Sequence, residues 1–437
     1  GLECLERFAQ RVRDIPSHRI RIVGTNALRE AANTSEFIAK AEKLMGCPIE
    51  VISGIEEARL IYLGVSHTLA SDSERRLVID IGGGSTEFIV GERFEPLELE
   101  SLEMGCVSFT KRYFNDGLIT EKKFQLAVFG ALRELLSIKR RYRRQGWADC
   151  VGSSGTIKAV RHACISLGFC EDRVTASALK KLKEKILSYN HVDDIDIEGL
   201  KAQRKAVLPA GIAILSAAFD SLGIKQIRFS AGALREGLLY DMIGRLRHED
   251  VRERSISALI KRYHVDQDHI NRVEQTALIA LTQVRDSWHL DNNEYHNMLS
   301  WAARCFETGL TIAHSQYHKH SAYLLLNSDL PGFTKREQSQ LASMMQGHRR
   351  KFPLTLFDAL PAREGKHYGR LTVLLRLAIV LHRSRSKERL PAFRLSAKKG
   401  QIQLTFPDNW LSHHPLTRTD LEQEAGYLAD AGFELKI

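Results

Sequence analysis

The chain has 437 residues, of which 43% are hydrophobic and 27% are charged, and these values are close to those of an ordinary globular protein. Length and composition exclude a disordered or fibrous chain and leave room for two to four domains. The seven cysteines form no Cys-x-x-Cys pair, which argues against a disulfide framework or a zinc ribbon and favours a reducing cytoplasm. The longest apolar run, residues 206–219, is too short to span a bilayer and predicts a buried helix.

The charge is uneven. The chain carries a formal net charge of +10, with −5 over residues 1–100 and +8 over residues 301–437. A basic second half suggests a polyanionic partner, whereas basic runs such as residues 139–144 and 348–351 can equally be solvated helix faces.

Residues 1–244 alternate between helical and extended patterns. The pattern predicts a helix over residues 28–45 and another over residues 56–65. Strands are predicted at residues 19–24, 49–52, 77–81, 86–91, 97–102, 150–151 and 226–229. Alternation of this kind, with glycines at strand ends, is typical of an α/β fold.

From about residue 245 the pattern becomes helical, and this predicts a separate helical domain. Helical periodicity is found over residues 252–263, 268–285, 295–308, 335–346 and 368–383. After residue 389 a strand at residues 401–406 and a helix near residues 420–428 predict a small α+β tail.

The sharpest motif is a glycine-rich segment from Asp80 to Thr86, which lies between two predicted strands and so forms a hairpin turn. Gly82, Gly83 and Gly84 would let the backbone adopt positive φ and direct N–H groups at an anion. Ser85 and Thr86 would add hydroxyl donors, and Asp80 could hold Mg²⁺ through water. A plain tight turn is the alternative.

Two further loops could bind phosphate. Ser153, Gly155 and Thr156, followed by Lys158 on a helix, suit an oxyanion at a helix N-terminus, although the segment taken alone favours an ordinary N-cap turn. Residues 230–237 connect a strand to a helix where α/β proteins place ligands, and close helix packing is the competing explanation for their glycines.

Glu56 and Glu57 open a predicted helix. Two acids in a first turn ordinarily complement the helix dipole. A phosphoanhydride hydrolase, however, needs one carboxylate to deprotonate the attacking water. Arg29 could act as a phosphate clamp.

In this order, the motifs resemble the exopolyphosphatase / guanosine pentaphosphate phosphohydrolase family of the actin-like superfamily. The resemblance rests on the segments around Arg29 and Glu57, the Asp80–Glu87 hairpin, and residues 104–108, 152–158 and 230–237. It continues through residues 320–323 and 327–333 of the helical part.

The resemblance implies roles for individual residues. Glu57 matches the carboxylate that activates water, Asp80 matches the metal-binding acid, and Gly82 to Ser85 match a phosphate loop. Glu87 and Arg29 fall near the reacting phosphate.

The implied fold consists of α/β actin-like (ribonuclease H-like) lobes, an all-helical HD-like domain and a small α+β C-terminal domain. The corresponding boundaries are residues 1–60 for the remainder of the first lobe, 61–244 for the second lobe, 245–388 for the helical domain and 389–437 for the tail.

Two departures from the family pattern matter. The family's first phosphate loop is absent, so we expect that the chain begins in mid-domain. Phe306-Glu307 stands where relatives carry a His-Glu pair, which removes a metal ligand and argues against an HD-type second active site. We expect His314, His318, His320 and His348 to be structural or surface residues.

The sequence therefore predicts a Mg²⁺-dependent exopolyphosphatase, with Arg349, Arg350 and Lys351 along a polyphosphate channel. Hydrolysis of guanosine pentaphosphate at the same site is the alternative, and so is polyphosphate binding without turnover, because the first loop is missing. We expect a cytoplasmic homodimer with no nucleic-acid partner, and peripheral association with the inner membrane is the alternative location.

Overall fold

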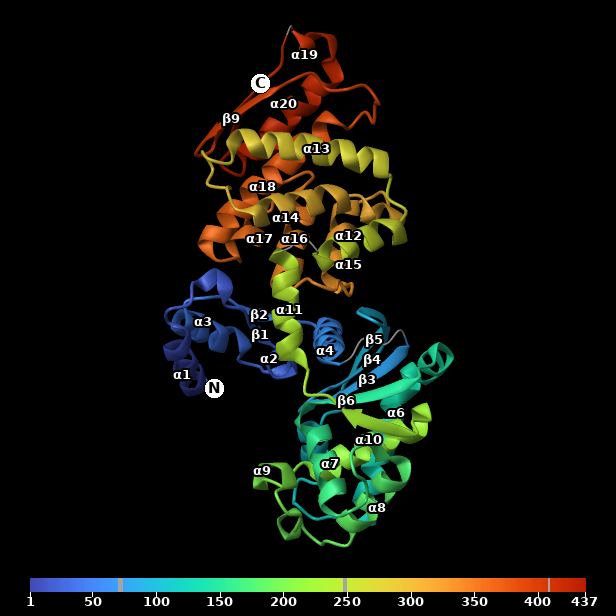
Figure 1. The fold of residues 1–437 in the computed structure, drawn as a ribbon. Helices are drawn as coiled ribbons and strands as arrows, with labels where there is room; N and C mark the ends of the chain where they lie inside the picture. The colour runs from blue at the N-terminus through green and yellow to red at the C-terminus, as the bar shows by residue number, and fades with distance from the viewer. Residues whose placement is uncertain (70–73, 247–249, 408) are drawn as a thin grey trace. The chain divides into compact units, whose positions relative to one another are not determined.

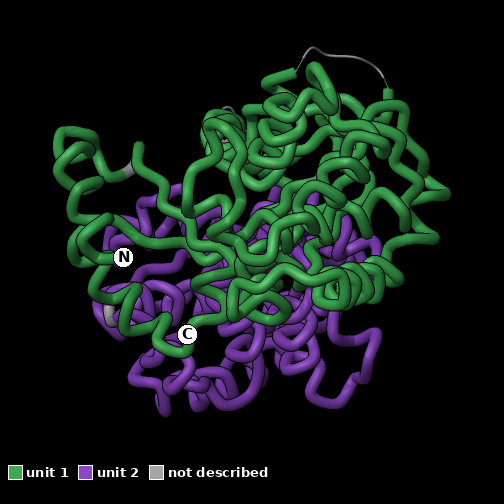
Figure 2. The backbone as a smooth tube through the Cα atoms, turned by 90° about the horizontal axis from the view of Figure 1, so that it is seen from below, with its two compact units in different colours: residues 1–250 green, residues 251–437 purple. Residues whose placement is uncertain are grey.

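The computed structural model describes residues 1–69, 74–246, 250–407 and 409–437. These residues form two compact units, residues 1–250 and residues 251–437 (Figure 2).

The first unit begins with a short two-stranded parallel sheet and its helices (Figure 1). Its elements are α1 (Leu2–Val12), β1 (Ile22–Gly24), α2 (Asn26–Glu30), α3 (Thr34–Met45), β2 (Ile49–Val51) and α4 (Gly54–Thr68). The prediction of one helix over residues 28–45 was wrong, because the chain leaves α2 at Ala31 with extended φ and ψ. The Thr34 hydroxyl then donates to the Leu28 and Ala31 carbonyls, 2.7 Å away in each case, and stabilises the break.

The larger sheet of this unit has six strands in the order β5-β4-β3-β6-β8-β7. The strands are β3 (Arg75–Ile81), β4 (Thr86–Glu92), β5 (Glu95–Leu102), β6 (Asp149–Ser153), β7 (Val174–Thr175) and β8 (Gln226–Phe229). β3, β4 and β5 form an antiparallel meander, while β6 and β8 continue the sheet in parallel with β3. This topology is that of the predicted actin-like lobe.

Helices surround this sheet and supply most of its core. They are α5 (Cys106–Tyr113), α6 (Glu121–Gln145), α7 (Ser154–Ser166), α8 (Ala176–Leu187), α9 (Ala202–Lys205), α10 (Leu208–Leu222) and α11 (Leu234–Leu246). The predicted buried helix is confirmed as α10, whose residues are almost all buried. None of the described helices is both long and apolar enough to cross a membrane.

Helices α4 and α11 approach each other closely through glycines. A Cβ at Gly64 would lie 2.0 Å from the Ala233 carbonyl oxygen, and one at Gly237 would lie 1.7 Å from the Leu60 carbonyl oxygen. Neither position therefore tolerates a side chain without moving a backbone.

The second unit is helical, with a small sheet at its end (Figure 1). Its helices are α12 (Val251–Arg262), α13 (Gln267–Val284), α14 (Asn293–Cys305), α15 (Tyr317–Asn327), α16 (Lys335–Gly347), α17 (Leu354–Asp358), α18 (Ala362–Leu381), α19 (Trp410–His413) and α20 (Pro415–Ala429). The sheet has the order β11-β10-β9, with β9 (Arg394–Lys398), β10 (Gln401–Thr405) and β11 (Glu434–Lys436).

The sheet and the helices of the second unit share one core. Ile402 and Leu404 of β10 face the same buried cluster as Trp288 and Trp301, which are fully buried. The expected strand and helix after residue 389 are confirmed, and they pack as part of the helical unit.

Candidate active site

The register of four strands places four polar side chains in one row. Asp80 of β3 lies opposite Glu87 of β4 and Ser153 of β6, and Glu87 lies opposite Ser101 of β5. Directly opposed residues present their side chains on the same face of a sheet. The Ser101 hydroxyl donates to Glu87 Oε1 at 2.8 Å, and the Ser153 hydroxyl donates to Asp80 Oδ2. Two carboxylates are thus held side by side at the base of the glycine hairpin.

The carbonyl groups of the glycine hairpin accept hydrogen bonds from the first turn of α5. The Gly82 carbonyl accepts from the Cys106 N–H, and the Gly83 carbonyl accepts from the Val107 and Ser108 N–H groups, at 2.9–3.0 Å. Within the described residues, the N–H groups of Gly83, Gly84 and Ser85 have no backbone acceptor. This leaves a cluster of donors suited to a phosphate group.

The reason for the glycines differs from the prediction. The expectation of positive φ at Gly82, Gly83 and Gly84 was wrong, since none of them lies in that region. Instead, a Cβ at Gly84 would lie 1.8 Å from Asn26 Oδ1, and one at Gly105 would lie 2.3 Å from the Gly83 backbone. Gly84 and Gly105 are therefore glycine because neighbouring groups approach their Cα atoms closely.

Of the two hydroxyl residues in this hairpin, one has a structural role. The Thr86 side chain is fully buried and donates to the Met104 carbonyl, so it holds the hairpin against the segment before α5. Ser85 is buried and hydrogen-bonds to Glu87. Ser85 therefore contacts a carboxylate of the row described above.

The adjacent glutamates of α4 have different partners. Ser53 caps the helix by accepting from the Glu56 N–H at 3.1 Å. The Glu56 carboxylate accepts from Nε and Nη2 of Arg59, each at 2.8 Å, and Arg59 Nη2 also donates to Asp241 of α11 at 2.5 Å. Glu57 instead accepts from Arg29 Nη1 at 3.0 Å. Glu56 thus belongs to a structural network, and Glu57 lies with the carboxylates of the hairpin.

Burial raises the pKa of all three acids, and neighbouring negative charges add to the shift of Glu57 and Glu87. Burial raises the pKa of Asp80 to about 6, although hydrogen bonds from Ser153 and Ser154 oppose the shift. The pKa of Glu87 is raised well above its usual range by burial and then by the charges of Glu57 and Asp80. Burial also raises the pKa of Glu57, which Arg29 partly counteracts. A carboxyl with a raised pKa is a better proton acceptor at neutral pH.

The predicted second loop contributes unevenly to the site. Ser153 contacts Asp80, and the Ser154 backbone has a φ of 80°, a strained conformation for a residue other than glycine. Thr156 is buried, while Lys158 is exposed. Gly155 leaves room for Arg204, because a Cβ there would lie 2.2 Å from the Arg204 guanidinium.

The third loop has a packing role. A Cβ at Gly232 would lie 2.1 Å from Thr68 Oγ1. This glycine, like Gly237, therefore allows α4 to pack closely against the segment. The Ser230 N–H donates to the Gly152 carbonyl at 2.9 Å and extends the pairing of β8 with β6. Close packing accounts for the glycines of this segment.

The donor set at the row of acids fits a hard divalent cation. Carboxylate and hydroxyl oxygens are the ligands that Mg²⁺ prefers, and Mg²⁺ is commonly held by one or two carboxylates together with water and substrate phosphates. In the described parts of the chain, no three His, Cys, Asp or Glu side chains converge to hold a metal by themselves. Asp80 as a single protein ligand acting through water is compatible with both statements.

Three residues at this site carry little signal in the sequence. Ser101 is identified only by the strand register, Asn26 by its approach to Gly84, and Arg204 by its approach to Gly155. Ser101 lies in a strand of alternating polarity, and Asn26 and Arg204 lie in the short helices α2 and α9. Neither setting differs from that of an ordinary surface residue.

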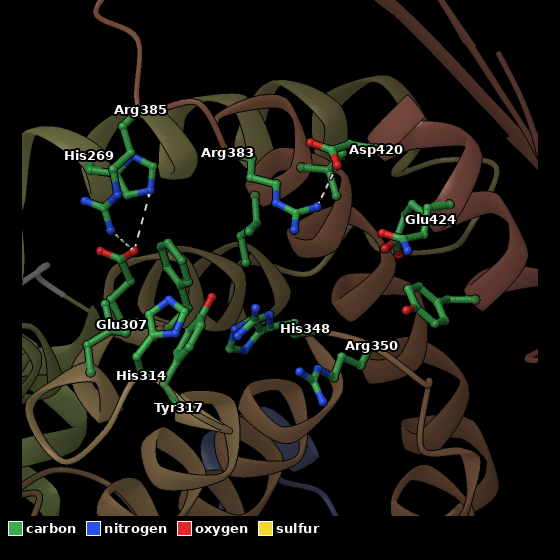
Figure 3. A pocket seen from close by; sticks show the side chains of 17 residues that line it. His269, Glu307, His314, Tyr317, His348, Arg350, Arg383, Arg385, Asp420 and Glu424 are labelled. Atoms are coloured by element: carbon green, nitrogen blue, oxygen red, sulfur yellow. Dashed lines mark hydrogen bonds and ion pairs between the residues drawn. The ribbon is translucent and has the colours of Figure 1, made fainter. Parts of the chain in front are cut away.

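The predicted polyphosphate residues belong to the second unit. Arg349 and Arg350 line a cavity of about 730 Å³, together with His314 and His348 (Figure 3). Lys351 lines a neighbouring hollow of about 220 Å³, together with His318. Whether these residues form a polyphosphate channel stays a prediction.

Comparisons with known proteins agree with this geometry. Residues 1–246 match the Ppx/GppA phosphatase family, and residues 251–425 match domain III of Ppx/GppA phosphatase. The chain is 42% identical over 437 residues to a guanosine-5'-triphosphate,3'-diphosphate pyrophosphatase of Vibrio cholerae serotype O1, covering all of this chain and 87% of that protein. It is 39% identical over 438 residues to the protein of that name from Photobacterium profundum, with the same coverage.

A solved exopolyphosphatase from Cytophaga hutchinsonii has a similar fold, with a TM-score of 0.50 and 23% identity over 55% of this chain and 80% of that one. The row of acids, the glycine hairpin beside it and the match over nearly the whole sequence lead to one assignment: the chain belongs to the Ppx/GppA phosphatase family.

Proposed function

We propose that the protein hydrolyses the terminal phosphoanhydride of the 5'-triphosphate group in guanosine 5'-triphosphate 3'-diphosphate (guanosine pentaphosphate). The observation that carries this choice of substrate is the 42% identity over 437 residues to a relative named for that reaction. The geometry around Glu57 supports the type of chemistry.

In the proposed reaction, Glu57 accepts a proton from the water that attacks the terminal phosphorus. Its raised pKa favours this transfer, and Arg29 at 3.0 Å holds the carboxylate in place. The N–H groups of Gly83, Gly84 and Ser85, which have no backbone acceptor among the described residues, would bind the phosphate oxygens, because backbone donors aimed at developing charge stabilise the transition state. Bound Mg²⁺, associated with Asp80, would neutralise phosphate charge.

Polyphosphate hydrolysis, which the charge distribution favoured, has weaker support. Many basic residues already have acceptors within the chain: in the run at residues 139–144, for example, Arg141 pairs with Glu98 and Glu100. The likeness to the solved exopolyphosphatase, at 23% identity, concerns the fold alone. Polyphosphate therefore serves as the competing substrate in the test.

The test is a competition assay in the protein encoded by the complete reading frame. Phosphate release is measured with guanosine pentaphosphate, with polyphosphate of defined length, and with both together. A higher kcat/KM for the nucleotide supports the proposal, and a higher value for polyphosphate overturns it. Tight binding of either substrate without phosphate release would instead indicate a binding module.

A further inference from the structure

Two of the seven cysteines lie against each other at the end of α7. Cys164 is fully buried in the core of the first unit, and Cys170 is half-buried shortly after it in the chain. The Cys164 thiol donates a hydrogen bond to the Cys170 sulfur. Both thiols are free. The fold therefore holds two reduced sulfur atoms in direct contact, although the sequence contains no Cys-x-x-Cys motif.

The turn that ends α7 brings the two thiols together. Gly168 adopts a φ of 69°, the left-handed conformation with which glycine commonly ends a helix. The Phe169 N–H donates to the Cys164 carbonyl at 2.8 Å. The Gly168 N–H donates to the Ile165 carbonyl at 2.9 Å. These are the two hydrogen bonds of a Schellman motif, which folds the chain back onto the last helical turn, so that Cys170 returns to the level of Cys164.

A charged clamp fixes the segment that carries Cys170. Arg161 of α7 donates through Nη2 to Asp172 Oδ1 at 2.7 Å and through Nε to the Asp172 carbonyl at 3.0 Å. The segment is thus bound to α7 on both sides of Cys170, at Phe169 and at Asp172. Restraint of this kind favours a bond between the two sulfurs, because the effective concentration of tethered groups rises as their relative motion is limited.

The two thiols differ in access and in acidity. Burial raises the pKa of Cys164 to about 12. Burial also raises the pKa of Cys170, but the hydrogen bond from Cys164 and the charge of Arg161 oppose this rise. The thiolate is the reactive species in disulfide exchange. Cys170, which is also less buried, is therefore the thiol that reacts first with a reagent in solution.

We propose that Cys164 and Cys170 form a reversible intramolecular disulfide by exchange with a low-molecular-weight disulfide. In the first step the Cys170 thiolate attacks one sulfur of the reagent, whose S–S bond breaks and releases one thiolate. In the second step Cys164 loses its proton to solvent and attacks the Cys170 sulfur of this mixed disulfide, and the second thiolate of the reagent leaves. The two cysteines lose two electrons in total, and the reagent is reduced to two thiols.

The disulfide is a modification of the first unit and is separate from the candidate active site. Cytoplasmic thiols are kept reduced, and disulfides that form there are usually transient and redox-sensing. α7 begins at Ser154, whose hydroxyl donates to the Ile81 carbonyl of the hairpin at 3.0 Å. Cys164 lies about 15 Å further along the helix axis. The inference therefore does not depend on the proposed function.

Equilibration of the full chain with mixtures of reduced and oxidised glutathione tests the proposal. Both cysteines lie in one tryptic peptide, residues 162–173, so mass spectrometry after acid quenching and alkylation distinguishes its closed, glutathionylated and reduced forms. The exposed Cys4, in the peptide of residues 1–7, is the internal control and should form only the mixed disulfide. A closed peptide 162–173 supports the proposal. Glutathionylation of Cys170 without closure, or a reduced pair in samples where Cys4 is modified, overturns it.

The same equilibrium in urea shows whether the folded structure brings the thiols together. A short loop can also close in an unfolded chain, so the quantity compared is the effective concentration of the two thiols in each state. We expect a value roughly tenfold higher or more in the folded chain, because the Schellman turn and the clamp restrain the pair. An equal or lower value in the folded chain would overturn the proposal.

Two single variants test the clamp. Asp172→Ala removes the carboxylate that Arg161 binds. Glu171→Ala removes the same charge from the neighbouring exposed residue and is the matched control. Asp172→Ala should lower the effective concentration by roughly two- to fivefold, in line with the modest energy of an exposed ion pair. Equal values in the two variants would overturn the role given to the clamp.

Discussion

Asp80 and Glu87 lie directly opposite each other on β3 and β4, so two buried carboxyls share the end of one hairpin. Each is held by a serine of the outer neighbouring strand, Asp80 by Ser153 and Glu87 by Ser101. The charge of Asp80 helps to raise the pKa of Glu87, and a bound cation would remove this cost. Binding of a cation beside the two carboxyls would therefore reduce the electrostatic repulsion between them.

Glu57→Gln should reduce kcat by roughly 10²–10⁴-fold and leave substrate affinity nearly unchanged, because it removes a general base and preserves shape. The matched control is Glu56→Gln on the preceding residue. That change weakens the buried contacts to Arg59 and should lower the melting temperature, with kcat retained below it. Steady-state kinetics and calorimetry on both variants separate the roles, and equal kcat losses would contradict the assignment.

Asp80→Asn should change how stability depends on pH. The folded-state pKa of about 6 exceeds the ordinary value of 3.8, so the folded protein binds this proton more tightly than the unfolded chain. The contribution of protonated Asp80 to the free energy of unfolding is fully present below pH 4 and is lost as the pH rises through 6. Asparagine cannot ionise. The free energy of unfolding of the variant, relative to that of the wild type, should therefore rise by up to about 3 kcal/mol between pH 4 and pH 7.5.

Calorimetry in EDTA at the two pH values measures this difference. A difference in melting temperature that does not vary with pH would contradict the burial of an ionisable Asp80. Added Mg²⁺ should then raise the melting temperature of the wild type at pH 7.5 more than that of the variant. An equal rise in both would place the cation elsewhere.

Gly84→Ala should impair the hairpin, whereas Gly83→Ala should be tolerated. The new Cβ at position 84 would meet Asn26 Oδ1 at 1.8 Å, while at position 83 the nearest atom, on Val107, is 3.6 Å away. We expect a lower kcat/KM in Gly84→Ala only. Combining it with Asn26→Gly should restore part of the stability. Similar losses in both alanine variants would indicate that backbone freedom, rather than close approach, requires the glycines.

Arg376→Met should destabilise the second unit by about 3–5 kcal/mol, because Glu424 is then left buried without its partner. The double variant Arg376→Met/Glu424→Leu should recover much of this loss. The thermal unfolding of both variants checks the expectation. A double variant no more stable than the single one would show that the contacts of Arg376 to the Gly347 and Arg350 carbonyls dominate.

The local sequence pattern was sufficient to predict most helices and strands, but it did not predict the contacts between them. The strand at residues 226–229 is confirmed to the residue because its alternation and flanking turns are local properties. The break after Glu30 depends on the Thr34 side chain bonding back to the chain, which periodicity does not detect. The Ser101–Glu87 contact depends on strand register. The separate roles of Glu56 and Glu57 depend on long-range contacts: Arg59, which binds Glu56, also binds Asp241, 182 residues further along the chain, and Glu57 binds Arg29, 28 residues before it.

The glycine contact between α4 and α11 also bears on evolution and engineering of the site. Glu57 lies on α4 one helical turn before the stretch where Leu60 and Gly64 touch the α11 backbone. Backbones packed without intervening side chains cannot slide past each other by repacking. The position of Glu57, the proposed general base, is therefore set by α11 as much as by α4, and we expect substitutions at Gly237 to appear in screens as losses of turnover.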